Sequence, residues 1–139
     1  MRDAGVEDAA ALAPLLASLG YPDEPAAIAA RIAALVNAGD RILLAEEGGA
    51  IVGFSVLHVT PMLHKPYPIG RITAFVVDEA LRGRGIGARM LAASEEALFA
   101  AGCGAIELTS AAHRTGAHHF YERLGYSEKR MRFWKDRPR

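Results

Sequence analysis

The chain has 139 residues, 16 basic and 16 acidic side chains, and a hydrophobic share of 51%. These values predict one globular domain over residues 1–139 and argue against intrinsic disorder. The balanced charge argues against nucleic acid or an anionic membrane as a partner, and no apolar run reaches the roughly 20 residues of a membrane span. A single cysteine, Cys103, excludes an internal disulfide and fits a reducing compartment, so we expect a cytoplasmic protein. The excess of arginine over lysine is typical of a GC-rich bacterial genome.

Two helices are predicted at the start of the chain. Residues 6–19 repeat leucine at helical spacing, and Gly20 then ends the pattern. Residues 24–38 form a second amphipathic pattern, with Pro25 in its first turn and Gly39 just after its end.

Three strands are predicted next. Residues 41–46 and 51–60 are apolar runs separated by a tight Gly-Gly turn, which predicts a hairpin. Residues 69–77 form the third strand. Its run from Ile72 to Val77 is apolar on both faces, so we expect this strand at the centre of the sheet.

The second half of the chain alternates helices and strands. A strong helical pattern covers residues 85–101, and a short helix is predicted over residues 115–124. Strands are predicted over residues 105–110 and 127–135. The order α-α-β-β-β-α-β-α-β therefore predicts a mixed α/β fold whose early strands are antiparallel.

A glycine-rich loop with two arginines, Arg82 to Gly87, leads from the third strand into the long helix. Free N–H groups at a helix start attract anions, and glycines let a phosphate approach the backbone, so the obvious ligand is a diphosphate. The loop has no Gly-Lys-Ser/Thr, which excludes a P-loop. Gly83-x-Gly85-x-x-Ala88 fits a loose dinucleotide fingerprint, although five residues separate it from its strand. A glycine turn that only starts a helix is the other alternative.

Two motifs resemble those of the GNAT family of N-acetyltransferases. The loop is similar to the family's Gln/Arg-x-x-Gly-x-Gly/Ala motif, and AHHFYERLGY at residues 117–126 is similar to its Ala-x-x-Phe-Tyr-x-x-x-Gly-Phe stretch. One helix and one strand separate the two motifs, as the family requires. The resemblance implies a mixed, mostly antiparallel central sheet flanked by helices. Two positions depart from the pattern: only residues 1–4 remain for the family's first strand, and Arg114 replaces its usual Asn.

The resemblance also implies acetyl-CoA as cosubstrate. It would lie between the strands over residues 69–77 and 105–110, with its pantetheine arm paired to strand backbone and its pyrophosphate on the loop amides. Arg114 would hold a phosphate in place of the family's Asn. The implied cofactor-binding residues are Phe75, Val76, Val77, Arg82, Gly83, Arg84, Gly85, Ile86, Gly87, Ala88 and Arg114.

The implied activity is an acyltransferase that moves an acetyl group to a primary amine of a small molecule or a protein, by direct attack in a ternary complex. Tyr121 falls on the family tyrosine that protonates the leaving thiolate, and a phenol with a pKa of about 10 is a proton donor at neutral pH. The alternative for Tyr121 is core packing, since it lies at helical spacing with Phe120 and Leu124.

The base that deprotonates the amine stays open. Some family members place a Glu, which can act as the base, where this chain has Arg71. Arg71 either binds a substrate carboxylate or is a charged residue at the edge of the structure without a catalytic role. No carboxylate precedes Asp78 on that strand. We therefore expect that a water, held by backbone carbonyls and by His64 or His58, removes the amine proton, or that the amine enters the site already neutral. The candidates are His58, His64, Glu107, His113, His118, His119 and water.

Other chemistry is less favoured by the sequence. Cys103, His113 and His118 match no zinc spacing, so no metal is expected, and Cys103 has no base beside it to make it a nucleophile. A non-catalytic acetyl-CoA sensor and a dinucleotide-binding domain are the alternative functions. The identity of the acceptor amine and the formation of a homodimer stay open.

Overall fold

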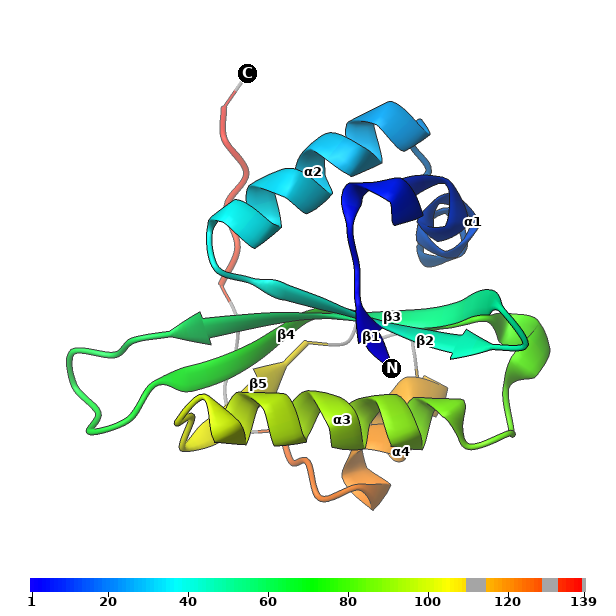
Figure 1. Ribbon diagram of the computed structural model, residues 1–139. Coiled ribbons are helices and arrows are strands. Elements are labelled where there is room, and N and C mark those ends of the chain that lie inside the picture. Colours follow the sequence, from blue (N-terminus) through cyan, green and yellow to red (C-terminus); the bar gives the residue numbers. More distant parts are fainter. Residues whose placement is uncertain (110–114, 129–132, 139) are drawn as a thin grey trace. The chain divides into compact units, whose positions relative to one another are not determined.

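The computed structural model describes residues 1–109, 115–128 and 133–138. They belong to two compact units, residues 1–109 and residues 110–139. Helix α4 (Thr115–Arg123) belongs to the second unit. The first unit contains β1 (Arg2–Asp3), the 3₁₀ turn η1 (Val6–Asp8), α1 (Ala9–Leu19), α2 (Pro25–Asn37), β2 (Arg41–Glu47), β3 (Ala50–Thr60), β4 (Ile69–Val77), the 3₁₀ turn η2 (Glu79–Leu81), α3 (Ile86–Ala100) and β5 (Ala105–Leu108) (Figure 1).

The structure confirms the mixed α/β class and most predicted elements. The predicted helix over residues 6–19 begins with a 3₁₀ turn, and the strand predicted over residues 105–110 ends at Leu108. The strand predicted over residues 127–135 is wrong for its described residues, because residues 127, 128 and 133–135 have no strand conformation and are exposed. Residues 129–132 of that prediction lie outside the described residues.

The five strands form one sheet in the order β1-β2-β3-β4-β5. The first four strands are antiparallel neighbours, and β4 and β5 are parallel. The predicted hairpin joins β2 to β3 through Gly48 and Gly49, whose φ angles of +60° and +81° favour glycine. Parallel strands need a long crossover, and η2 with α3 provides it between β4 and β5.

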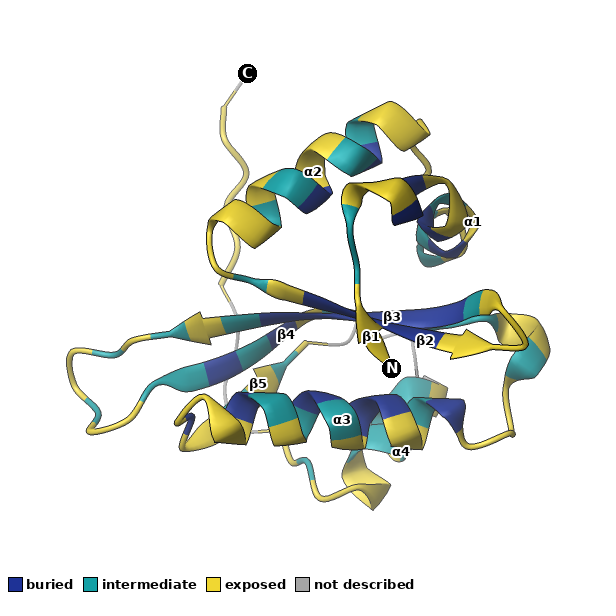
Figure 2. Cartoon of the chain, in the orientation of Figure 1, coloured by how far each residue is buried: buried dark blue, intermediate teal, exposed yellow. Residues whose placement is uncertain are grey.

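Helices cover both faces of this sheet (Figures 1 and 2). On one face the apolar sides of α1 and α2 pack against alternate residues of β2, β3 and β4, among them Leu44, Phe54 and Val76. On the other face Ile86 and Met90 of α3 pack against a second cluster from the same strands. Strand β4 is the fourth of the five described strands rather than the central one, and its apolar run is explained by the helices that cover both of its faces.

Two glycines of the sheet allow α3 to approach closely. A Cβ on Gly53 would lie 2.6 Å from the sulfur of Met90 and 2.8 Å from the carbonyl oxygen of Val76. A Cβ on Gly70 would lie 3.0 Å from the side chain of Leu98. The close approach of α3 therefore depends on the missing side chains at these two positions.

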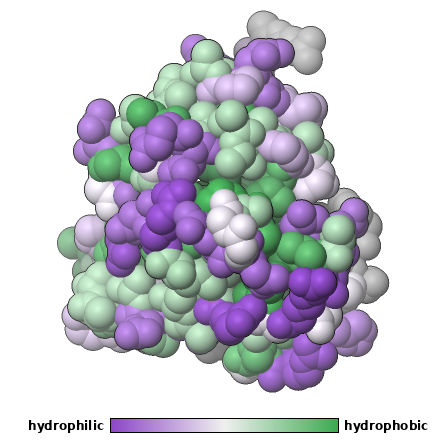
Figure 3. All heavy atoms as spheres, turned by 45° about the vertical axis from the view of Figure 1, so that its right-hand side comes forward, coloured by the Kyte–Doolittle hydropathy of each residue, from purple (hydrophilic) through white to green (hydrophobic). Residues whose placement is uncertain are grey.

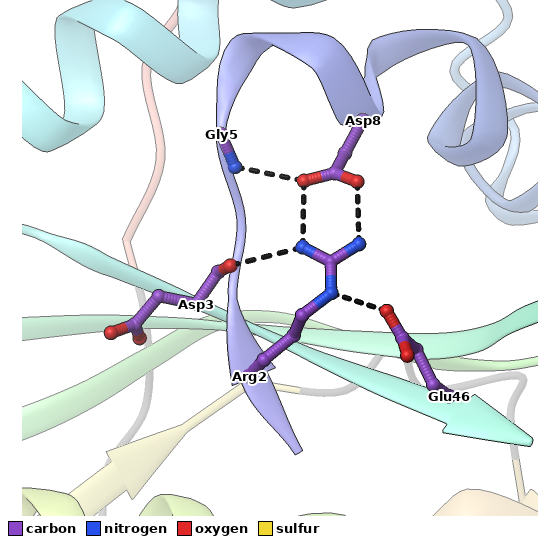
Figure 4. Close-up of polar contacts among 5 residues, drawn as sticks. All are labelled: Arg2, Asp3, Gly5, Asp8 and Glu46. Carbon is purple, nitrogen blue, oxygen red and sulfur yellow. Dashed lines mark hydrogen bonds and ion pairs between the residues drawn. The ribbon is translucent and has the colours of Figure 1, made fainter. Parts of the chain in front are cut away.

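Strand β1 is only two residues long, and Arg2 anchors it (Figure 4). Its guanidinium donates to both carboxylate oxygens of Asp8, at 3.0 and 2.7 Å, and to Glu46 on β2. Asp8 also accepts from the N–H of Gly5 at 2.8 Å. The hydrogen bond from Arg2 is the largest of the influences that hold the pKa of buried Asp8 below its ordinary value, although burial opposes it. Ion pairs of Arg2 thus help to stabilise a strand that is too short to be held by its backbone hydrogen bonds alone.

Hydrophilic and hydrophobic side chains are interspersed on the face seen in Figure 3. Among the helices of the described residues, none is both long and apolar enough to cross a membrane.

Candidate functional site

The pairing of β4 with β5 stops before β4 ends, and the edge of β4 that β5 leaves unpaired, residues 73–77, is called the opening below. The last paired residues are Ile72 and Leu108, whereas β4 continues to Val77. The pairing of β4 with β3 shifts by one residue at this point. Val56 pairs with Ala74 and Leu57 pairs with Ile72, so Thr73 is an additional residue that forms a β-bulge in β4. Thr73 is exposed although it belongs to a central strand. The exposed bulge marks the place where β5 no longer covers the edge of β4.

The peptide groups of β4 divide between its two edges. The N–H of Asp78 donates to the carbonyl oxygen of Val52 on β3, at 2.8 Å. Alternate peptide groups of a strand face opposite edges, so those of Val76 also face β3, while those of Phe75 and Val77 face the edge that β5 leaves. Of the three residues expected to bind a pantetheine arm, Phe75 and Val77 are therefore the suitably oriented ones.

The predicted glycine loop runs from η2 to the first turn of α3. Gly83 and Gly85 have φ angles of +85° and +76°, and no heavy atom lies within 4 Å of the position of a Cβ on either residue. Their backbone conformation, rather than crowding, therefore requires glycine. The N–H of Arg89 donates to Gly85 at 3.1 Å, and no side chain caps the helix start.

The start of α3 therefore offers hydrogen-bond donors to an anion. The helical hydrogen bonds leave the N–H groups of Ile86, Gly87 and Ala88 without an intrahelical acceptor. Gly87, which the sequence analysis grouped with the loop, belongs to the first turn of the helix. Three consecutive amides at the positive end of a 15-residue helix suit a phosphate group.

The arginines of the loop are held by carboxylates. Arg82 lies 3.6 Å from Glu79, three residues earlier in the chain, and Arg84 lies 3.1 Å from Glu47 at the end of β2. Arg89 lies 3.9 Å from the same Glu47 carboxylate. Sequence reasoning missed Glu47, because the hairpin that brings it beside the loop is distant in the chain.

A row of ionisable side chains crosses the sheet beside the opening. His58 of β3 is the register partner of Arg71 of β4, and Arg71 is the partner of Glu107 of β5. The Arg71 guanidinium lies 3.2 Å from the Glu107 carboxylate. At the other end of the row, His58 Nδ1 lies 2.6 Å from the Oδ1 atom of Asp40. The sequence named three of these four residues as candidates and missed Asp40.

Two residues of the loop before β4 are placed away from the opening. Tyr67 packs its ring against Gly104, just before the closed end of the β4–β5 pair, so a Cβ on Gly104 would collide with it. His64 is exposed in the loop that precedes Tyr67. Cys103 is buried, and this burial raises the pKa of its thiol, which disfavours the nucleophilic thiolate.

The second unit contains α4 with the second motif. Tyr121 is half-buried, and its ring makes edge contacts with Phe120 and Tyr126 at centroid distances of 5.3 and 6.1 Å. Gly125 follows the end of this helix with a φ of +95°, the left-handed conformation of a glycine cap. The predicted phosphate contact of Arg114 and the candidate base His113 lie outside the described residues.

No group of three His, Cys, Asp or Glu side chains that could hold a metal ion occurs in residues 1–109, 115–128 and 133–138. The donors at the opening are backbone amides and guanidinium groups instead. This set suits an anionic ligand with an extended arm, because amides bind phosphate and a strand edge pairs with amide groups.

Comparisons with known proteins identify relatives of the chain. Residues 10–126 match the model of the acetyltransferase (GNAT) family, a stretch that includes parts of both units. An aminoalkylphosphonate N-acetyltransferase of Salmonella typhimurium is 40% identical over 92 residues, which are 66% of this chain and 60% of that protein. The match thus spans less than two thirds of that relative's length. The uncharacterized N-acetyltransferase YhfO of Bacillus subtilis is 33% identical over 92% of this chain and 89% of its own.

Solved structures agree with this relationship. A GNAT family acetyltransferase of Staphylococcus aureus is 29% identical and superposes with a TM-score of 0.84 over 97% of this chain and 96% of that one. The aminoglycoside N-acetyltransferase AAC(6')-Iy, solved with CoA, has the same fold with a TM-score of 0.84 over 99% and 93% of the chains, at 18% identity. The expected fold and the expected acyltransferase class are therefore confirmed at the level of the family. The chain belongs to the GNAT family of acetyltransferases.

Proposed function

We propose that the chain is an N-acetyltransferase that uses acetyl-CoA and acts on the primary amine of a small molecule by direct attack in a ternary complex. The observation that carries the proposal is the opening at Thr73, which lies on the same strand that leads into the glycine loop and α3. The proposal treats residues 1–139 as one catalytic domain, since the family match includes parts of both units.

The residues of the first unit fit acetyl-CoA by their donor chemistry. The amides of Ile86, Gly87 and Ala88 would hold the pyrophosphate, with Arg82 and Arg84 as added charge. The peptide groups of β4 that face the opening would pair with the pantetheine arm. When bound, acetyl-CoA supplies a thioester whose carbonyl carbon bonds to the amine nitrogen while its C–S bond breaks and the electron pair leaves with sulfur.

Tyr121 is the proposed proton donor to the departing sulfur. A tyrosine phenol ordinarily has a pKa of about 10, so this residue type suits the role of general acid. Direct attack is favoured over a cysteinyl intermediate because burial raises the pKa of the Cys103 thiol. Arg114 remains the proposed contact to a cofactor phosphate.

The acceptor is proposed to carry an anionic group in addition to its amine. Arg71 lies beside the opening, its side chain is 41% exposed, and its partner Glu107 is exposed as well. A planar guanidinium suits bidentate recognition of a carboxylate or phosphonate. The relative from Salmonella typhimurium, which is named for aminoalkylphosphonates, supports this class of acceptor. A protein amine is the second acceptor class to be tested.

A panel of amines tests the proposal through thiol release from acetyl-CoA and product mass. It contains aminoalkylphosphonates, amino acids, uncharged alkylamines, an aminoglycoside and a lysine peptide. We expect turnover with an anionic amine, and Arg71→Ala should raise KM for that amine while changing KM for an uncharged amine of equal length much less. Acetyl-CoA binding without amine-dependent thiol release would instead indicate a sensor. Stabilisation by NADH but not acetyl-CoA would indicate a dinucleotide-binding domain.

A further inference from the structure

His58 and Asp40 form a hydrogen-bonded pair at the edge of the first unit's core. The 2.6 Å contact joins His58 Nδ1 to Asp40 Oδ1. Asp40 is fixed by its backbone, because its N–H donates to the carbonyl oxygen of Leu35 at 2.9 Å where α2 ends. The Asp40 side chain is 11% exposed, and that of His58 is 40% exposed. A nearly buried carboxylate thus holds an imidazole that still reaches solvent.

This contact determines which ring nitrogen is available for chemistry. An ionised carboxylate only accepts hydrogen bonds, so the ring donates from Nδ1. In the neutral imidazole the lone pair then belongs to Nε2. The ring is therefore held in the tautomer that can accept a proton at its other nitrogen.

The pair lies near the opening in β4. His58 is opposite Arg71, and Arg71 precedes the exposed bulge at Thr73 by two residues, or about 7 Å along a strand. His58 alternates with Phe54 and Val56, which pack against α1 and α2, so these three side chains share one face of β3. A base, a guanidinium and the strand opening thus lie next to one another in the sheet.

We propose that His58, oriented by Asp40, is the general base for the acceptor amine. The assignment rests on the proposed function, and it replaces the expectation from sequence that a water or a neutral amine suffices. A proton passes from the ammonium group of the acceptor to Nε2 of His58. The freed lone pair of nitrogen forms the N–C bond to the acetyl carbonyl, and the C–S bond breaks with its electron pair leaving on sulfur. The nitrogen then loses its second proton to water as the departing sulfur is protonated, and His58 later returns the first proton to water.

The energetic need for such a base is large. An alkylammonium group has a pKa of about 10.4, so roughly one amine in 2,500 is neutral at pH 7. A positioned general base contributes about 10²- to 10⁴-fold in rate.

The other charged groups on the elements packed beside His58 are in ion pairs. Helix α1 contains no charged side chain. Asp40 is therefore the carboxylate that faces the imidazole directly, and Arg71 is the nearest cation in the sheet register. The neighbouring ion pairs are Arg71–Glu107 at 3.2 Å, Arg41–Asp3 at 3.0 Å and Arg31–Asp23 at 2.9 Å.

The kinetic test compares His58→Gln and Asp40→Asn with Asp23→Asn, which removes a different carboxylate from an ion pair in the same unit. His58→Gln should lower kcat/KM at pH 7 by at least tenfold and leave the acetyl-CoA Kd unchanged by calorimetry. The wild-type pH profile should level off once the imidazole is neutral, whereas that of His58→Gln should keep rising toward the pKa of the amine. Asp40→Asn should also lower kcat/KM, and Asp23→Asn should not. A loss below tenfold in His58→Gln overturns the assignment.

A second measurement needs no turnover. Nitrogen-15 chemical shifts of the neutral His58 ring in the free protein report which nitrogen carries the proton. We expect the Nδ1–H tautomer in the wild type and loss of this preference in Asp40→Asn. An Nε2–H tautomer in the wild type overturns the assignment. If the wild type turns over an amine and His58→Gln is equally active, only the assignment of His58 as the base is excluded. If the wild type is inactive with every amine, the proposed function is excluded as well.

Discussion

Replacing Gly85 by alanine tests whether the start of α3 holds the phosphates. Gly85 has a φ of +76° and a ψ of +9°, in the left-handed region. A methyl group there would meet no heavy atom within 4 Å. The perturbation is therefore confined to backbone strain, which costs about 1–2 kcal/mol for a residue with a Cβ. We expect the free energy of unfolding in urea to fall by that amount.

Ligand binding should respond more strongly than stability. Relief of the strain rotates the peptide groups at the helix start, and a lost hydrogen bond to a charged phosphate costs about 1.5–3 kcal/mol. That range corresponds to about 10- to 150-fold in Kd, which calorimetry with acetyl-CoA measures. Gly20→Ala is the matched control, because Gly20 has a φ of +102° and equal free space at the end of α1. It should lose similar stability and no affinity.

One combination of results would exclude the loop amides as the diphosphate site. If Gly85→Ala loses stability as Gly20→Ala does but binds acetyl-CoA within twofold of the wild type, the loop amides do not hold the diphosphate. The strain would then be real and the assigned site wrong. A fall in affinity without any loss of stability would show that the glycine conformation costs alanine nothing, which contradicts the structural argument.

Tyr121→Phe should keep its stability and its acetyl-CoA Kd but lose roughly 10²-fold or more in kcat, as expected for a missing general acid; normal turnover would leave Tyr121 a packing residue. Asp8 has a lowered pKa, chiefly through Arg2, so its contribution to stability is present above the unfolded pKa of about 3.9 and is lost as pH falls through the folded value. Urea unfolding should therefore show a deficit of Asp8→Asn at pH 7 that shrinks below pH about 4, and a constant deficit would contradict this linkage. Gly53→Ala should cost about 1–3 kcal/mol, because the carbonyl of Val76 cannot move aside as a side chain can; an unchanged melting temperature would show that β3 adapts freely.

The sequence alone predicted most of the fold. Leucine and isoleucine at helical spacing, with Gly20 and Gly39 at the helix ends, located α1 and α2 within a few residues. The apolar run from Ile72 to Val77 predicted a strand at the centre of the sheet. The structure gives β4 the predicted bounds but makes it the fourth of the five described strands. These signals succeed because periodicity and glycine conformation act over a few neighbouring residues. The strand predicted over residues 127–135 failed where it is described, because residues 127, 128 and 133–135 are exposed and have no strand conformation.

The glycine loop was also predicted from sequence, because its chemistry is contained in six consecutive residues. Its carboxylate partner Glu47 was not, since it lies 37 residues before Arg84. Likewise Asp40 and His58 are separated by 18 residues, and a helix end and a strand register bring them together. A slip of one residue in that register would turn His58 to the other face of the sheet. The local sequence thus determined the elements and the glycine loop, whereas tertiary pairing alone decided which charges meet beside the opening.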